Sequence, residues 1–235
     1  KGAAPWLAAS FLAFVLLALV ERRHPHPIFP PALLRLRHVV GAYLVCFLWS
    51  AGNLAFPVKL FVQDVLKYTP MAASLAFLPA TLVGGVAGLA VARLAPRLGL
   101  AKVLLGGLFL QALATLAFVS VVPGSSYWAM LLPAAMLGHA AFMAAWIAVR
   151  LLAVEGIPAA DFGVAGGAIY ATQHLGNAVG VPALMAILHA ATKGGSGPVA
   201  GFHAMFLGGT IFVLLALATA FLLCRNRTAP SHEGA

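Results

Sequence analysis

Seven long runs of apolar residues, separated by short polar connections, set the pattern of the chain. A membrane-spanning helix needs about 20 consecutive apolar residues, and each run has about that length. The runs cover residues 2–20, 39–60, 71–91, 103–122, 127–152, 164–190 and 202–224. The pattern therefore predicts an all-α membrane protein with seven transmembrane helices.

Composition supports lipid as the surroundings of most of the chain. Hydrophobic residues make up 63% of it and charged residues only 8%, whereas a soluble domain has about 25% charged residues. The net charge of +9 would suggest nucleic acid as a partner in a soluble protein. Here the bases lie in short connections between apolar runs, where they set membrane topology, so we expect no nucleic-acid partner.

The basic residues are distributed unequally between alternate connections. Ten lie on one side, namely Arg22, Arg23, Arg35, Arg37, Arg93, Arg97, Lys102, Arg150, Arg225 and Arg227. Four lie on the other side, namely Lys1, Lys59, Lys67 and Lys193. Because cytoplasmic connections carry the excess of Lys and Arg, we expect the N-terminus of this chain outside and its C-terminus in the cytoplasm.

The connection at residues 21–38 is the longest, and its four prolines favour extended chain. We expect it to be a cytoplasmic linker between an extra transmembrane helix at 1–20 and a six-helix unit at 39–224. Residues 225–235 then form a cytoplasmic tail. Six spans divide into three plus three, and such three-helix repeats must be inverted in the membrane, as in many transporters.

Three apolar runs each carry a stripe of polar or aromatic side chains. The stripes are Trp49, Asn53 and Phe56; His139, Met143 and Trp146; and Gln173, His174 and Asn177. Polar groups facing lipid would lack partners, so the stripes should face other helices or a wet cavity. Two interpretations stay open, hydrogen bonding between helices and the lining of a substrate cavity for bulky apolar or cationic molecules.

The acidic residues and the missing motifs limit the chemistry. No Asp or Glu lies in the middle of an apolar run, although proton-driven carriers usually keep one at membrane depth. The chain has no motif of a hydrolase or nucleotide-binding enzyme, and its cysteines lack metal-ligand spacing. His24 and His26 could bind a metal weakly, but the proline spacing of a basic linker explains them equally well. We therefore expect no enzyme activity, catalytic residue, metal or cofactor. Lys59, near the outer end of its run, is expected to extend to the membrane interface.

A basic segment follows the third apolar run. Gly84 and Gly88 are four residues apart, so they share a helix face on which another helix can approach closely. Beyond them, Arg93, Arg97 and Gly99 are expected to form a short cytoplasmic loop.

Three segments resemble the major facilitator superfamily, and in particular the C-terminal half of the fourteen-span drug:proton antiporters of the EmrB/QacA type. They are residues 21–37, 61–70 and 156–180. Gly88 and the basic residues after it are similar to the family's second copy of its cytoplasmic loop motif. Two departures occur: Pro96 stands where the family usually has an acid, and an arginine common near Gln173 is missing.

The resemblance implies a secondary active transporter of the bacterial inner membrane. Such a carrier exports drugs or other small amphipathic compounds in exchange for protons, and its two six-helix halves rock about a central cavity. Its partners would be a small-molecule substrate, protons, membrane lipid and an N-terminal half that supplies the coupling carboxylates. This chain is therefore expected to be a fragment that does not transport alone. The alternative is a seven-span structural or sensory membrane protein without transport.

Overall fold

The computed structural model describes residues 12, 15–16, 19–20, 36–193 and 197–227. The helix predicted at 1–20, the linker and most of the C-terminal tail fall largely outside these residues. The total of seven spans and the location of the N-terminus outside the cytoplasm therefore stay predictions.

Six helical segments of the described chain are long and apolar enough to cross a membrane. They are Arg37–Asp64, Pro70–Leu98, Leu100–Val119, Tyr127–Val154, Phe162–Ala191 and Gly197–Arg225. Each overlaps one of the last six predicted apolar runs, those from residue 39 onward. No strand occurs among the described residues. The prediction of an all-α membrane protein is confirmed.

The first two segments are interrupted helices. Helices α3 (Arg37–Ala51) and α4 (Ala55–Asp64) are separated at Gly52, Asn53 and Leu54. The side-chain oxygen of Asn53 accepts a hydrogen bond of 2.9 Å from the backbone N–H of Ala55, which stabilises the start of α4. Helices α5 (Pro70–Ala76) and α6 (Leu78–Leu98) are separated only at Phe77.

The basic loop expected at residues 93–99 is helical instead, so that prediction is wrong in extent. Helix α6 continues to Leu98, and Gly99, at φ 86°, alone separates it from α7 (Leu100–Val119). A positive φ is readily adopted only by glycine, so the turn is sharp. Arg93 and Arg97 lie exposed in the last turns of α6, where the negative end of the helix dipole favours cations.

The second half of the bundle contains the longer helices. A π-helical turn, η1 (Tyr127–Leu131), leads into α8 (Leu132–Val154). A short 3₁₀ turn, η2 (Ala159–Asp161), precedes α9 (Phe162–Ala191), and α10 (Gly197–Arg227) follows.

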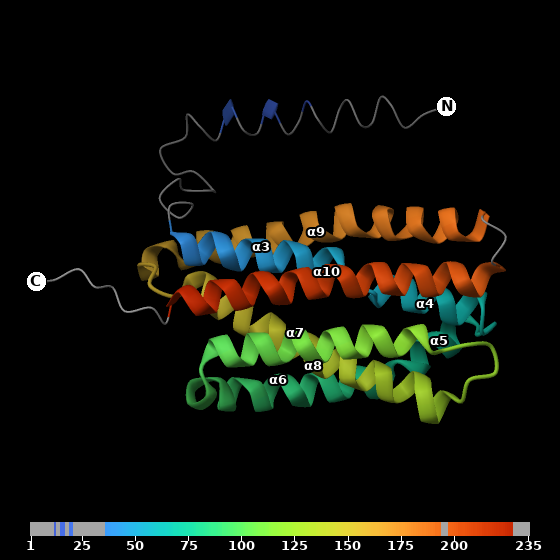
Figure 1. Cartoon of the computed structure of the whole chain (residues 1–235). Coiled ribbons are helices and arrows are strands. Elements are labelled where there is room, and N and C mark those ends of the chain that lie inside the picture. Colours follow the sequence, from blue (N-terminus) through green and yellow to red (C-terminus); the bar gives the residue numbers. More distant parts are fainter. Residues whose placement is uncertain (1–11, 13–14, 17–18, 21–35, 194–196, 228–235) are drawn as a thin grey trace, which may run out of the picture.

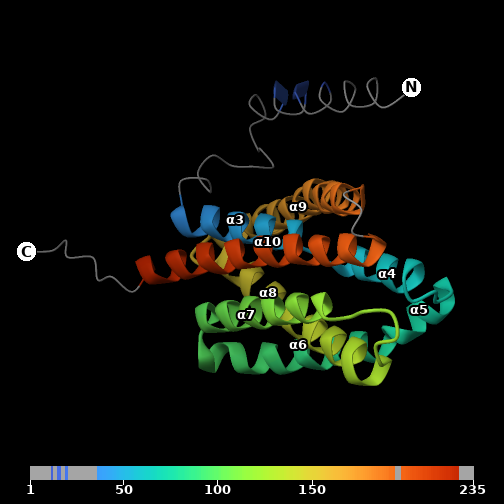
Figure 2. The same ribbon diagram turned by 45° about the vertical axis from the view of Figure 1, so that its right-hand side comes forward.

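The helices form two layers, with α3, α9 and α10 in one and α6, α7 and α8 in the other (Figures 1 and 2). The main partners of α3 are α9 and α10, and those of α8 are α6 and α7. The first helix of each three-span set therefore packs against the second and third helices of the other set. This reciprocal exchange is the arrangement expected for two inverted three-helix repeats.

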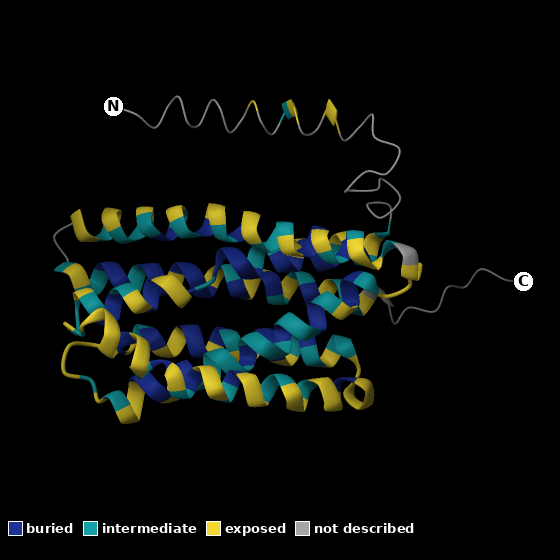
Figure 3. Ribbon diagram, turned by 180° about the vertical axis from the view of Figure 1, so that it is seen from behind, coloured by how far each residue is buried: buried dark blue, intermediate teal, exposed yellow. Residues whose placement is uncertain are grey.

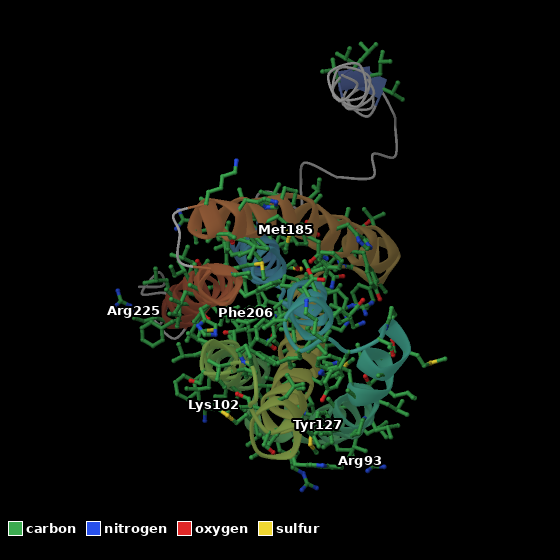
Figure 4. The ribbon with its side chains drawn as sticks, turned by 90° about the vertical axis from the view of Figure 1, so that its right-hand side faces the viewer. Arg93, Lys102, Tyr127, Met185, Phe206 and Arg225 are labelled. Carbon is green, nitrogen blue, oxygen red and sulfur yellow. The ribbon has the colours of Figure 1, made fainter. Side chains whose placement is uncertain are left out.

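Side chains are buried mainly where the two layers meet (Figure 3). One buried cluster extends from Val39 to Trp49 of α3 onto α7, α8, α9 and α10. The other surrounds Phe61 of α4 and Phe206 of α10. The segments Pro70–Leu98 and Phe162–Ala191 are the least buried, each at 17% of its most apolar stretch, and they lie at opposite edges of the bundle (Figure 4).

Candidate functional site

Helix α6 is held close to α8 by the glycine face predicted from the sequence. A Cβ added at Gly84 would lie 3.2 Å from the Cβ of His139, and one at Gly88 would lie 3.8 Å from the nearest atom of Ile147. The expectation of close approach is confirmed at Gly84, whereas a Cβ at Gly88 would make an ordinary van der Waals contact. The contact also fixes the part of α8 that carries His139.

A cavity of about 230 Å³ lies beside the interruption between α3 and α4. Its walls come from that interruption, α4, Phe77, α7 and α8. The lining residues are Asn53, Leu54, Ala55, Val58, Lys59, Phe77, Gln111, Thr115, Phe118, Ala135, Gly138, His139, Phe142 and Met143. The cavity is mostly apolar, with a few polar groups, as is typical of sites for small molecules.

Three of the sequence-predicted site residues line this cavity: Asn53, His139 and Met143. The Nδ1 atom of His139 lies 2.9 Å from the backbone oxygen of Ala135. Because a carbonyl oxygen only accepts, Nδ1 must donate, and in the neutral imidazole Nε2 is then an acceptor. The histidine therefore keeps one ring nitrogen for a hydrogen bond to another group.

Trp49 and Trp146 belong to an aromatic cluster instead. The Trp49 ring lies 4.8 Å from Phe142 and 6.0 Å from Trp146, measured between ring centroids. The guanidinium of Arg150 lies 4.9 Å from the Trp146 ring and 4.2 Å from the Tyr170 ring, which is the geometry of cation–π contacts. Both tryptophans thus pack α8 against α3 and α9.

Phe56 lies outside the cavity, with 54% of its surface exposed. The three residues of the stripe on α9 also differ in their distance from the cavity. Asn177 contacts the cavity indirectly, since its Oδ1 is 3.5 Å from Nδ2 of Asn53. Gln173 is half-buried, His174 is exposed, and neither lines the cavity.

Several lining residues were not predicted from the sequence. Gln111 and Thr115 are four residues apart on α7, so they share a face that the apolar run concealed. The rings of Phe77, Phe118 and Phe142 carried no pattern that set them apart from core residues. Lys59, which was expected to extend to the membrane interface, is among the lining residues.

A second, much smaller void lies behind the wall of the cavity and shares Asn53, Gln111 and Phe142 with it. Its volume is about 10 Å³, which is close to the space that one water molecule needs. The Oγ of Ser50 and the Oε1 of Gln111 are buried without a hydrogen-bond partner in the described part of the chain. A hydroxyl and an amide oxygen beside one void form a polar spot at the helix interruption.

The family model of the Major Facilitator Superfamily matches residues 3–181. The chain belongs to this superfamily. Membership makes it a multi-pass membrane protein of a transporter family rather than an enzyme.

Relatives within the superfamily have names that refer to antibiotics. The chain is 30% identical over 222 residues to a methylenomycin A resistance protein of Streptomyces coelicolor, covering 93% of this chain and 46% of that protein. It is 28% identical over 246 residues to the puromycin resistance protein pur8 of Streptomyces alboniger, with coverage of 97% and 48%. It is 29% identical over 231 residues to the cephamycin export protein CmcT of Amycolatopsis lactamdurans, with coverage of 95% and 47%. The chain thus spans about half the length of these curated relatives.

Proposed function

We propose that this chain is the C-terminal half of a fourteen-span, EmrB/QacA-type carrier that exports small amphipathic compounds by alternating access. The cavity at the interrupted span Arg37–Asp64 is the observation that carries the proposal. Interrupted helices beside a cavity near the membrane midplane are a recurrent way in which transporters build a substrate site. The names of the relatives support export of antibiotics as the activity.

The complete carrier would need a second six-helix unit against this one. The segments Pro70–Leu98 and Phe162–Ala191, at opposite edges of the bundle, are the least buried and are proposed to contact it. The same unit would supply the carboxylates for proton coupling, because this chain has none in the middle of a span. The present chain would contribute Asn53, His139, Met143 and Gln111 to the substrate cavity.

The distribution of basic residues predicts the orientation in the bacterial inner membrane. Green fluorescent protein fused after the C-terminus of the complete carrier should fluoresce, because it folds in the cytoplasm. Alkaline phosphatase inserted after Lys193, in the connection between α9 and α10, should be active outside. Activity of the phosphatase at the C-terminus instead would contradict the proposed orientation.

The export function predicts loss of transport from changes in the cavity. In the complete carrier, Asn53→Ala and His139→Ala are each expected to lower the rate of puromycin export about tenfold, since each removes a polar group from the cavity. Uptake of puromycin into everted membrane vesicles, normalised to the amount of carrier, measures this rate.

Phe56→Ala is the matched control, because Phe56 lies on α4 but outside the cavity, and it should stay within about twofold of the wild type. Wild-type rates for Asn53→Ala and His139→Ala would contradict the assignment of the cavity. If the wild-type carrier exported neither puromycin nor ethidium nor a naphthyl carboxylate, the alternative of a membrane protein without transport would be favoured.

A further inference from the structure

We propose that the cavity selects amphipathic carboxylates, with Lys59 as the counter-charge of the carboxylate and the aromatic wall as the contact for the apolar body. This inference rests on the proposed export function and adds a substrate class to it. This substrate class differs from the cationic molecules that the stripe of aromatic and methionine residues suggested.

Lys59 is the one Lys or Arg among the residues that line the cavity, and none of the lining residues is Asp or Glu. His139, the other ionisable lining residue, is neutral or positive but never negative. The side chains of this half therefore give the cavity a positive charge. An anion is therefore expected to bind there more tightly than a cation with the same apolar body.

The acids of the described chain lie away from the cavity. Asp64 ends α4 five residues after Lys59, whereas residues on one helix face are three or four apart. Glu155 and Asp161 lie between α8 and α9, at the end of the bundle opposite to α4 (Figure 1). The lining thus supplies no carboxylate partner for the ammonium of Lys59.

Lys59 lies where its side chain reaches both water and the wall of the cavity. Lys59 is exposed and lies five residues before the end of the segment Arg37–Asp64, so its ammonium can stay hydrated at the membrane interface while its stem lines the cavity. A positive side chain at the wall of the cavity therefore favours a ligand that carries the opposite charge.

The start of α4 brings a positive helix end to the cavity, although the negative end of α3, which ends at Ala51, lies at the same interruption. Helix α4 begins at Ala55, which lines the cavity together with Leu54. The N-terminus of a helix is the positive end of its dipole, and in transporters such half-helix ends point at anionic groups of substrates. Because the two helix ends oppose each other and the N–H of Ala55 is already bonded to Asn53, the selection rests on the side chain of Lys59.

The rest of the wall suits an apolar body. Phe77, Phe118, Phe142 and Met143 line the cavity, and aromatic and thioether groups bind flat, apolar molecules. A charged head near Lys59 and a flat body against these side chains would use both parts of the site.

Three small compounds with one naphthalene body test the inference. They are 1-naphthylacetate, 1-naphthylacetamide and 1-naphthylmethylammonium, which are negative, neutral and positive. Their dissociation constants are measured by equilibrium dialysis against the complete carrier in lipid nanodiscs at low salt. The acetate is expected to bind about tenfold more tightly than the amide, and the ammonium to bind most weakly.

Substitutions then assign the preference to one side chain. Lys59→Met should remove the tenfold preference without weakening binding of the amide, and Lys59→Arg should keep it. Lys193→Met is the matched control, because Lys193 is an exposed lysine in the connection between α9 and α10 and lies outside the cavity lining. It should bind all three compounds as the wild type does.

The outcomes separate this inference from the proposed function. Equal binding of the acetate and the amide, or a preference that survives Lys59→Met, would overturn the inference while puromycin export still supported a carrier. Tighter binding of the ammonium would also overturn it and would indicate that the other half places a carboxylate opposite Lys59. A complete carrier that neither binds these compounds nor exports puromycin or ethidium would overturn both.

Discussion

Replacing Trp49 by alanine is expected to lower the free energy of unfolding of the complete carrier by about 3 kcal/mol, near the low end for such truncations in protein cores. The indole is 3% exposed and packs against Phe142 and Trp146, so its removal leaves a void between α3 and α8. The low end applies because lipid is as apolar as the protein core, so mainly packing is lost. Reversible unfolding in mixed micelles with increasing SDS measures the change.

Trp128→Ala is the control for this measurement. Trp128 is 75% exposed, so its removal should change the free energy by no more than about 0.5 kcal/mol. Trp49→Phe keeps part of the ring contact and should cost less than Trp49→Ala. A Trp49→Ala carrier that unfolds as the wild type does but exports poorly would show that Trp49 acts on substrate rather than in packing.

The second large effect is expected from Gly180→Val, which should reduce the yield of folded carrier severely. A Cβ at Gly180 would collide with the backbone oxygen of Ala51, and one at Gly176 would lie 2.5 Å from the backbone oxygen of Phe47. Backbone cannot rotate away as a side chain can, so α9 would have to move off α3. Overpacking of this kind costs about 1–3 kcal/mol or more.

Gly106→Val is the control, because nothing lies within 4 Å of a Cβ at that position on α7. Size-exclusion chromatography of fluorescent fusions in detergent gives the fraction of monodisperse carrier for each variant. A Gly180→Val carrier as monodisperse as Gly106→Val would mean that α3 and α9 tolerate a wider separation than this packing implies.

The six described spans were predictable because their apolar length is a direct requirement of the membrane. The stripe Trp49, Asn53 and Phe56 was predicted less well, for a definite reason. Its spacing assumes one continuous helix, but the chain unwinds between Ala51 and Ala55. Because of the unwinding, the faces of α4 are no longer in helical register with those of α3. Trp49 is therefore buried, Asn53 lines the cavity and Phe56 is exposed.

Other parts of the site needed the tertiary structure. Gln111 and Thr115 are ordinary polar residues in an apolar helix, and only the neighbouring α4 and α8 give them a cavity to face. The sequence did not predict that α6 continues to Leu98, because the basic residues and Pro96 after the apolar run are typical of a loop. A proline in the last turn forfeits only one backbone hydrogen bond and keeps a helical φ, so the helix ends at Gly99 instead.

The reciprocal packing of the two three-helix sets has a consequence for synthesis in the cell. About 100 residues separate the end of α4 from the start of α9, which roughly takes 5–20 s at the usual rate of translation. During that time α3 has left the ribosome, but its main partners, α9 and α10, do not yet exist. Asn53 therefore gains its partner Asn177 only after α9 is made, and the bundle closes when its last helix arrives.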